Sequence, residues 1–89
     1  MGNRALNIEG EIIQLVEVAK SGDKRLLRFN SDWRISGARL KEVRENFPDY
    51  KFEPFETVDY DFLIEEDGKI QLYWPDGEPI EDDEIEEVL

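Results

Sequence analysis

Acidic side chains are the main candidates for chemistry in this sequence, and they gather near its C-terminal end. The segment from Asp76 to Glu87 contains eight Asp or Glu and no Lys or Arg. Carboxylates suit hard cations, but Ca²⁺ needs about six to eight oxygens held by a preformed loop. The segment lacks the spacing of an EF-hand loop, whose acids alternate before a glycine. We therefore expect a solvated acidic surface and no metal site.

Two further carboxylates, Asp59 and Asp61, have the spacing of a pair on one side of a strand. General acid–base work would require them to lie in a cleft, whereas the solvent face of a strand makes them ordinary surface acids. The chain contains no Cys and no His. Thiolate nucleophiles, Ser-His-Asp triads and zinc sites built on Cys or His are thus excluded. We predict a protein that is not an enzyme, with no catalytic residue and no cofactor.

The charge is unevenly distributed along the chain, whose net charge is −12. Residues 1–44 carry nine Lys or Arg and six Asp or Glu, whereas residues 45–89 carry two Lys and seventeen Asp or Glu. An acidic field attracts basic proteins and repels nucleic acid and membrane surfaces. The asymmetry predicts a protein-binding module with a basic partner, acting as an antitoxin or inhibitor does. In the sharpest form of this hypothesis, the partner itself binds nucleic acid and the carboxylates imitate a row of phosphates.

We expect the partner-binding residues to lie in this acidic half. They are acids of the predicted outer face and tail, together with one aromatic side chain beside them: Asp59, Asp61, Tyr73, Asp76, Glu78, Glu81, Asp82, Asp83 and Glu84.

Two other functions compete with this hypothesis. In the first, the chain is a structural domain whose acids serve only solubility, and an exposed strand edge pairs two copies in a homodimer. In the second, the seven Lys or Arg of the segment Lys24–Arg44 bind nucleic acid. The net charge of −12 opposes an approach to phosphates, so we do not expect direct nucleic-acid binding.

The strongest local pattern is a hairpin in the second half of the chain. Apolar and polar residues alternate over 57–65 and again over 69–74, which is typical of strands with one buried side. A three-residue loop over 66–68 would place Ile64 opposite Ile70 and keep the apolar side chains on one face.

A helix is predicted before this hairpin, over residues 37–46. Ser36 can cap its start, and Pro48 ends it because the residue before a proline is disfavoured in the helical region. At the other end of the chain, Ile85, Val88 and Leu89 recur at helical spacing, which predicts one short helical turn.

The N-terminal third allows two structures. Residues 8–22 fit a helix, but their β-branched residues and Gly10 favour a strand. A turn at residues 21–23 would then lead into a second strand over 24–30, with Val16 opposite Phe29.

Together these elements predict a single small α+β domain over residues 1–89. It has two β-hairpins, one central helix and a short C-terminal helical turn, or an N-terminal helix in place of the first hairpin. No apolar stretch approaches the roughly 20 residues of a membrane span. We expect no membrane partner and a cytoplasmic location, with which the lack of cysteine agrees.

The segment Ile70–Gly77, which ends in Trp-Pro-Asp-Gly, and the acidic stretch after it resemble the end of the small bacterial domains grouped as DUF2442. Val16-Glu-Val18 and the strand that ends at Phe29 are similar to the opening hairpin of that family. The resemblance implies an α+β fold and a role as a small partner of toxin-like proteins. It implies little about activity, because the function of the family is uncharacterised.

Overall fold

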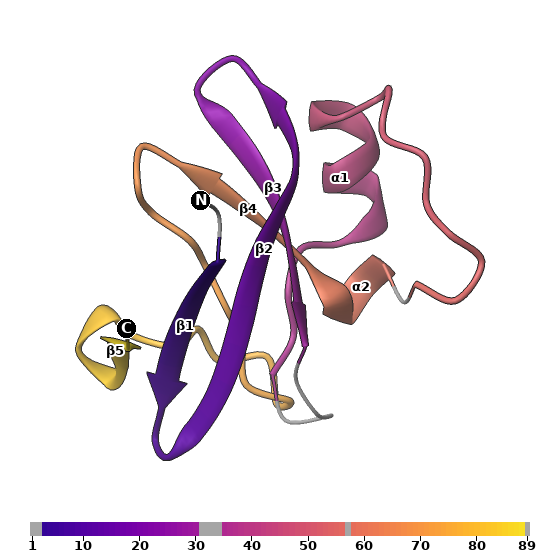
Figure 1. The fold of residues 1–89 in the computed structure, drawn as a ribbon. Coiled ribbons are helices and arrows are strands. Elements are labelled where there is room, and N and C mark those ends of the chain that lie inside the picture. Colours follow the sequence, from indigo (N-terminus) through magenta and orange to yellow (C-terminus); the bar gives the residue numbers. More distant parts are fainter. Residues whose placement is uncertain (1–2, 31–34, 57, 89) are drawn as a thin grey trace.

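An antiparallel sheet of five strands makes up most of the protein (Figure 1). The computed structural model describes residues 3–30, 35–56 and 58–88, without the side chains of residues 3, 30, 59 and 60. The strands are β1 (Asn3–Ile8), β2 (Glu11–Ser21), β3 (Lys24–Asn30), β4 (Phe62–Glu66) and β5 (Ile85–Val88). Their order across the sheet is β4-β3-β2-β1-β5, so the last strand lies beside the first.

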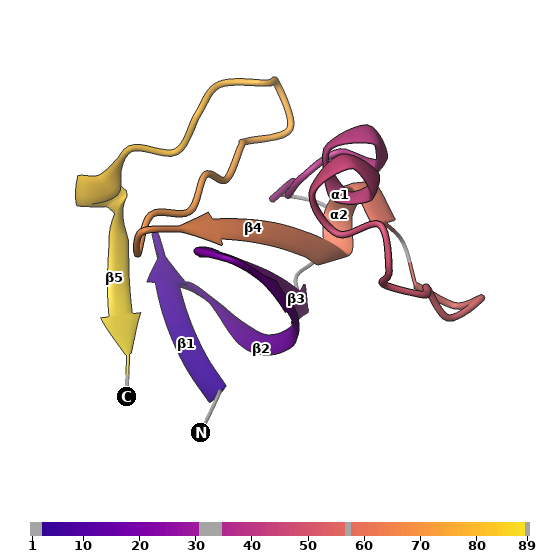
Figure 2. The same cartoon turned by 90° about the horizontal axis from the view of Figure 1, so that it is seen from above.

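The helices are short, and two of them lie at one end of this sheet: α1 (Leu40–Asn46) and the single turn α2 (Val58–Asp61). The 3₁₀ turn η1 (Asp82–Glu84) directly precedes β5 at the other end. Figures 1 and 2 show α1 and α2 beside β3 and β4, with β1 and β5 at the far end. The predicted α+β domain of two hairpins around a central helix is therefore wrong. Long-range strand pairing, which local patterns do not encode, makes the sheet the dominant element.

The first half of the chain forms three consecutive antiparallel strands, and the alternative N-terminal helix is wrong. Residues 11–30 do form a hairpin, but Phe29 lies opposite Leu15 rather than Val16. The register shifts between Glu17 and Ala19, which is a β-bulge. In the part of β2 that precedes the bulge, the odd-numbered residues face the inner side of the sheet, so Val16 faces the other side.

The predicted second hairpin begins as a hairpin and then opens. Its turn has two residues, because Glu66 and Lys69 exchange both backbone hydrogen bonds at 3.0 Å. Beyond that pair the two arms separate, and a segment around Gly37 lies between them. Ser36 exchanges backbone hydrogen bonds with Tyr73, while the Ala38 N–H donates to the Phe62 carbonyl at 2.6 Å. Ile64 therefore does not pair with Ile70, and β4 pairs instead with β3.

Two other predicted elements are also corrected. Residues 58–61 form α2 rather than the start of a strand, so the strand begins only at Phe62. The predicted C-terminal helical turn is wrong, because Ile85–Val88 is β5 and pairs with β1. Ile85 and Val88 are three residues apart and lie on opposite faces of this strand, so pairing with the free edge of β1 overrides their helical spacing. The central helix exists but begins at Leu40 and ends before Pro48.

The two faces of the sheet bury separate clusters, which we call the inner and outer clusters. The inner cluster is closed by the chain that returns after β4, and it contains Leu6, Ile8, Ile13, Leu15, Leu27, Phe29, Ile35, Leu63, Leu72 and Ile80. The outer cluster lies under α1 and contains Leu26, Val43, Phe47 and Phe62. The segment between α1 and α2, residues 48–56, which we call the connector, packs there too. Its Tyr50 and Phe52 make edge-to-face contacts with each other and with Phe62 of β4.

A buried carboxylate ties distant strands together on the inner face. Glu65 of β4 is 2% exposed, and its Oε2 accepts a hydrogen bond of 2.6 Å from Arg4 Nη1 of β1. Its Oε1 lies 2.7 Å from Arg25 Nη2 of β3 in an ion pair, at an angle outside the range of a hydrogen bond. In a flat sheet β1 and β4 would lie ~14 Å apart. The contact therefore requires the curled sheet that Figure 2 shows.

A second buried carboxylate fixes the connector to the sheet. The side chain of Glu56 is 2% exposed and accepts hydrogen bonds from the Glu53 N–H at 2.7 Å, Arg28 Nη1 at 3.1 Å and the Tyr50 hydroxyl at 3.1 Å. Burial raises the pKa of Glu56, but these three donors outweigh it and hold the pKa below its ordinary value of 4.5.

Because of these hydrogen bonds to the Glu56 carboxylate, we expect the free energy of unfolding to decrease as the pH falls below about 4.5. A carboxyl whose pKa is lowered by folding stabilises the fold above its unfolded pKa, and this contribution is lost as the pH falls through the folded pKa. In Glu56→Gln the free energy of unfolding should depend less on pH, as measured by urea unfolding between pH 3 and 6. Glu53→Gln, an exposed neighbour, is the control. Equal slopes for wild type and Glu56→Gln would contradict the assignment.

Candidate partner-binding site

Acidic side chains from both ends of the chain meet at one end of the sheet. The turn between β1 and β2 and the segment that runs from η1 into β5 enclose a shallow hollow of about 650 Å³. We call it the acidic hollow, and it is lined by Asn7, Glu9, Gly10, Asp83, Glu84, Ile85 and Glu86. Pairing of β1 with β5 brings these segments together, since Asn7 lies opposite Glu86 and Ile8 opposite Ile85.

The turn that carries Glu9 is tight and has a defined geometry. Glu9 and Gly10 are the only residues between the paired Ile8 and Glu11, and both have positive φ, 50° and 90°. The Asn7 side chain holds the turn by accepting the Gly10 N–H at 2.9 Å. Asn and Gly are the residues that such a turn favours at its first position. Glu9 thus occupies a backbone conformation that disfavours it, and its carboxylate is held at the rim of the hollow.

Three acids of the hollow lack a nearby cation. In the described chain, Glu9, Asp83 and Glu86 make no ion pair and accept no hydrogen bond through their side chains. Glu84 differs, because its Oε2 accepts the Glu81 N–H at 2.9 Å and so closes η1. Like charges around one hollow repel one another, and a bound cationic group would relieve the repulsion.

The hollow is not arranged as a metal centre. Among residues 3–30, 35–56 and 58–88, no three acidic side chains lie close enough together to hold a metal ion. A diffuse set of carboxylates on a rim is better suited to the spread charges of Lys and Arg side chains than to one compact cation.

The predicted site residues separate into several groups. Asp83 and Glu84 line the acidic hollow, and Glu81 and Asp82 precede them on the same exposed segment. Asp61 is half-buried at the end of α2, whereas the prediction placed it beside Tyr73 on the solvent face of a hairpin. The side chain of Asp59 lies outside the described residues.

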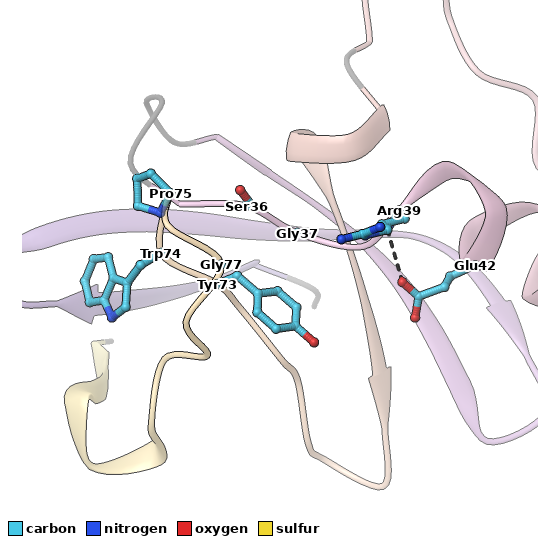
Figure 3. A pocket seen from close by; sticks show the side chains of 8 residues that line it. All are labelled: Ser36, Gly37, Arg39, Glu42, Tyr73, Trp74, Pro75 and Gly77. Carbon is cyan, nitrogen blue, oxygen red and sulfur yellow. Dashed lines mark hydrogen bonds between the residues drawn. The ribbon is translucent and has the colours of Figure 1, made fainter.

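The other three predicted residues lie near a different cleft, shown in Figure 3. This cleft has a volume of about 590 Å³ and is lined by Ser36, Gly37, Arg39, Glu42, Tyr73, Trp74, Pro75 and Gly77. Tyr73 is 39% exposed and extends toward the side of Arg39 and Glu42, whereas the Trp74 ring points the other way (Figure 3). Asp76 and Glu78 are exposed in the adjoining turn, where Asp76 Oδ1 accepts the Glu78 N–H at 2.9 Å.

Two residues of the acidic hollow, Glu9 and Glu86, were not among the predicted site residues. Glu9 could not be singled out, because the apolar residues 12, 13, 15 and 16 fit a helix as well as a strand and Glu-Gly is not a pair that a two-residue hairpin turn favours. Glu86 had no signal either, since its place beside Asn7 depends on pairing between the two ends of the chain.

Comparison with protein-family models, curated proteins and solved structures gives no match for this chain. The resemblance to DUF2442 therefore stays a prediction. In the described part of the chain, no helix has the length and apolar character needed to cross a membrane.

Proposed function

We propose that this protein is a non-catalytic binding module whose acidic hollow engages a basic protein in the cytoplasm. The observation that carries the proposal is the group of Glu9, Asp83 and Glu86, which share one hollow without a cation in the described structure. An antitoxin-like or inhibitor-like role fits such a surface, and a partner that itself binds nucleic acid would supply the basic groups.

The position of Glu9 supports this proposal over a purely solubilising role for the acids. Solubility requires charge somewhere on the surface, and it places no demand on a residue with a φ of 50°. A side chain kept where the backbone disfavours it suggests a use for that side chain at that place.

Pairing of two copies through the edge of the sheet is a weaker explanation. The edge strand β5 carries Glu86 and Glu87 within its four residues. Charged side chains on an edge strand oppose pairing with another edge, because the like charges of two copies would lie against each other.

We expect Glu9→Asn to weaken partner binding several-fold while raising stability by about 0.5–1 kcal/mol, since Asn suits a positive φ. Wild type and variant would be immobilised, exposed to host lysate at low salt and eluted with a salt gradient. Urea unfolding would give the stability. Weaker binding by a more stable protein cannot result from misfolding.

Glu53→Gln is the matched control, because it removes one exposed carboxylate remote from the acidic hollow. If the two variants lower the salt needed for elution equally, only net charge matters, and the proposed site is wrong. If no basic protein is retained by the wild type, the proposed function itself fails.

A further inference from the structure

The acidic hollow continues onto an uncovered apolar part of the sheet. Four large hydrophobic side chains are exposed in the described chain, and two of them, Ile12 (57%) and Val16 (37%), project from the same strand. Both alternate with the buried Ile13 and Leu15, so they lie on the outer face of β2.

Strand pairing places Ile12 in line with an acid of the hollow. Asn7 of β1 lies opposite Ile12 on one side and opposite Glu86 on the other. Directly opposed residues share a face, so Glu86, Asn7 and Ile12 form a row across three strands. With ~4.8 Å between neighbouring strands, Ile12 lies ~10 Å from the strand of Glu86, and Val16 lies ~13 Å further along β2.

The outer face of the sheet is covered on one half only. At β3 and β4, α1 and the connector cover the outer cluster around Leu26 and Phe62. At β5, β1 and the first half of β2 no helix of the described chain covers that face, whereas Val18 and Ala19 of β2 pack against the outer cluster. Both views show α1 and α2 at the opposite end (Figures 1 and 2). The covered half shows that a helix packs on this face.

We propose that the uncovered half of the outer face binds a basic amphipathic helix of a partner protein. This inference rests on the proposed function and specifies the chemistry of the partner. A helix with its side chains is ~10–12 Å wide, which matches the separation between Glu86 on β5 and Ile12 on β2. Lying along β1, it would place Lys or Arg beside Glu86 and the acidic hollow, and apolar side chains on Ile12 and Val16.

Charge decides between this occupant and a second copy of the chain. A second copy has a net charge of −12 and would bring its own Glu86 toward the same face. A basic helix provides cations for the carboxylates that lack them and apolar area for Ile12 and Val16. Helix binding through apolar anchors at i, i+3, i+4 and i+7 is a common mode of recognition.

The test uses two Lys/Leu peptides of about five helical turns. They have the same composition and charge, but one gathers its Leu residues on one face and the other distributes them around the helix. Fluorescence anisotropy should show the amphipathic peptide binding at least ~10-fold more tightly, because only it buries Ile12 and Val16 together. Ile12→Thr/Val16→Thr, which keeps β-branched residues in the strand, should reduce this ratio to below ~3-fold.

Phe55→Thr is the matched control, because Phe55 is 76% exposed on the connector and its loss should leave the ratio unchanged. Unfolding curves of the double variant must match those of the wild type, and Ile12→Thr alone replaces the double variant if they do not. An unchanged ratio in the variant, or equal binding of both peptides by the wild type, would overturn this inference and leave the proposed function standing. Failure of both peptides to bind would overturn the inference and the proposed function together.

Discussion

Gly37→Ala is expected to destabilise the protein by about 3 kcal/mol, although the substitution adds a single methyl group. Gly37 lies in the segment that separates the arms of the second hairpin. A Cβ at this position would overlap the Phe62 carbonyl oxygen and lie 2.8 Å from a ring carbon of Phe29. Neither neighbour can give way easily, since one is backbone of β4 and the other belongs to the inner cluster.

The substitution also threatens a backbone hydrogen bond. The Ala38 N–H donates to the same Phe62 oxygen, so moving the segment away from the carbonyl breaks that bond. Urea unfolding would measure the loss, with Gly22→Ala as the control. Gly22 has open space around its Cβ position and carries only the cost of a φ of 61°, about 1 kcal/mol. A Gly37→Ala variant no less stable than Gly22→Ala would contradict the close approach.

The second large effect is expected when Glu65 loses both of its cations. Arg4→Met/Arg25→Met keeps most of the apolar stems and removes both guanidinium groups. The carboxylate would then be buried without a counter-charge, which typically costs about 3–5 kcal/mol. Urea unfolding at neutral pH would measure the loss.

Adding Glu65→Leu to that double variant should recover most of the lost stability. An apolar side chain needs no cation, and the position is 2% exposed among the strands of the inner face. The cost therefore belongs to the unpaired carboxylate rather than to the arginine stems. A triple variant as unstable as the double variant would contradict this account, as would a double variant with the stability of the wild type.

Individual elements could be predicted where the signal is local. The helix ends before Pro48 because of the steric effect of that proline, and the turn at Gly22 follows from a glycine between two apolar runs. A strand over 62–66 was also predicted, although its expected solvent face is wrong, because Leu63 and Glu65 are buried as Phe62 is. Each of these depends on a few neighbouring residues.

The pairing of elements could not be predicted in the same way. The sequence favoured a three-residue loop before Lys69, because that loop kept Ile64 and Ile70 on one face. The arms do not stay paired beyond Lys69, since Ser36 and Ala38 bond to them from a segment some thirty residues away. With the arms apart, the two-residue Asp67-Gly68 turn carries no penalty in register.

Only some of the acids of the candidate site could be predicted from the sequence. The acidic tail pointed to Asp83 and Glu84, because a run of carboxylates is evident in composition alone. Glu9 and the apolar Ile12 were hidden by the ambiguity between helix and strand in the N-terminal third. Only the pairing of β1 with both β2 and β5 brings them beside the tail.

In the proposed function, the position of the acids creates the binding site, and the net charge alone does not. Two variants test it at equal net charge. Glu9→Asn/Asp83→Asn/Glu86→Gln neutralises the acidic hollow, whereas Glu45→Gln/Asp49→Asn/Glu53→Gln neutralises three exposed acids near α1.

The measurement is the Kd of the amphipathic Lys/Leu peptide for each variant at physiological salt. Exposed ion pairs contribute up to ~1 kcal/mol each, so we expect binding weaker by ~10- to 100-fold for the hollow variant. We expect a change below ~3-fold for the control variant, whose acids are remote from the site. Equal weakening of both variants would contradict the account and show that the acids act only through the net charge.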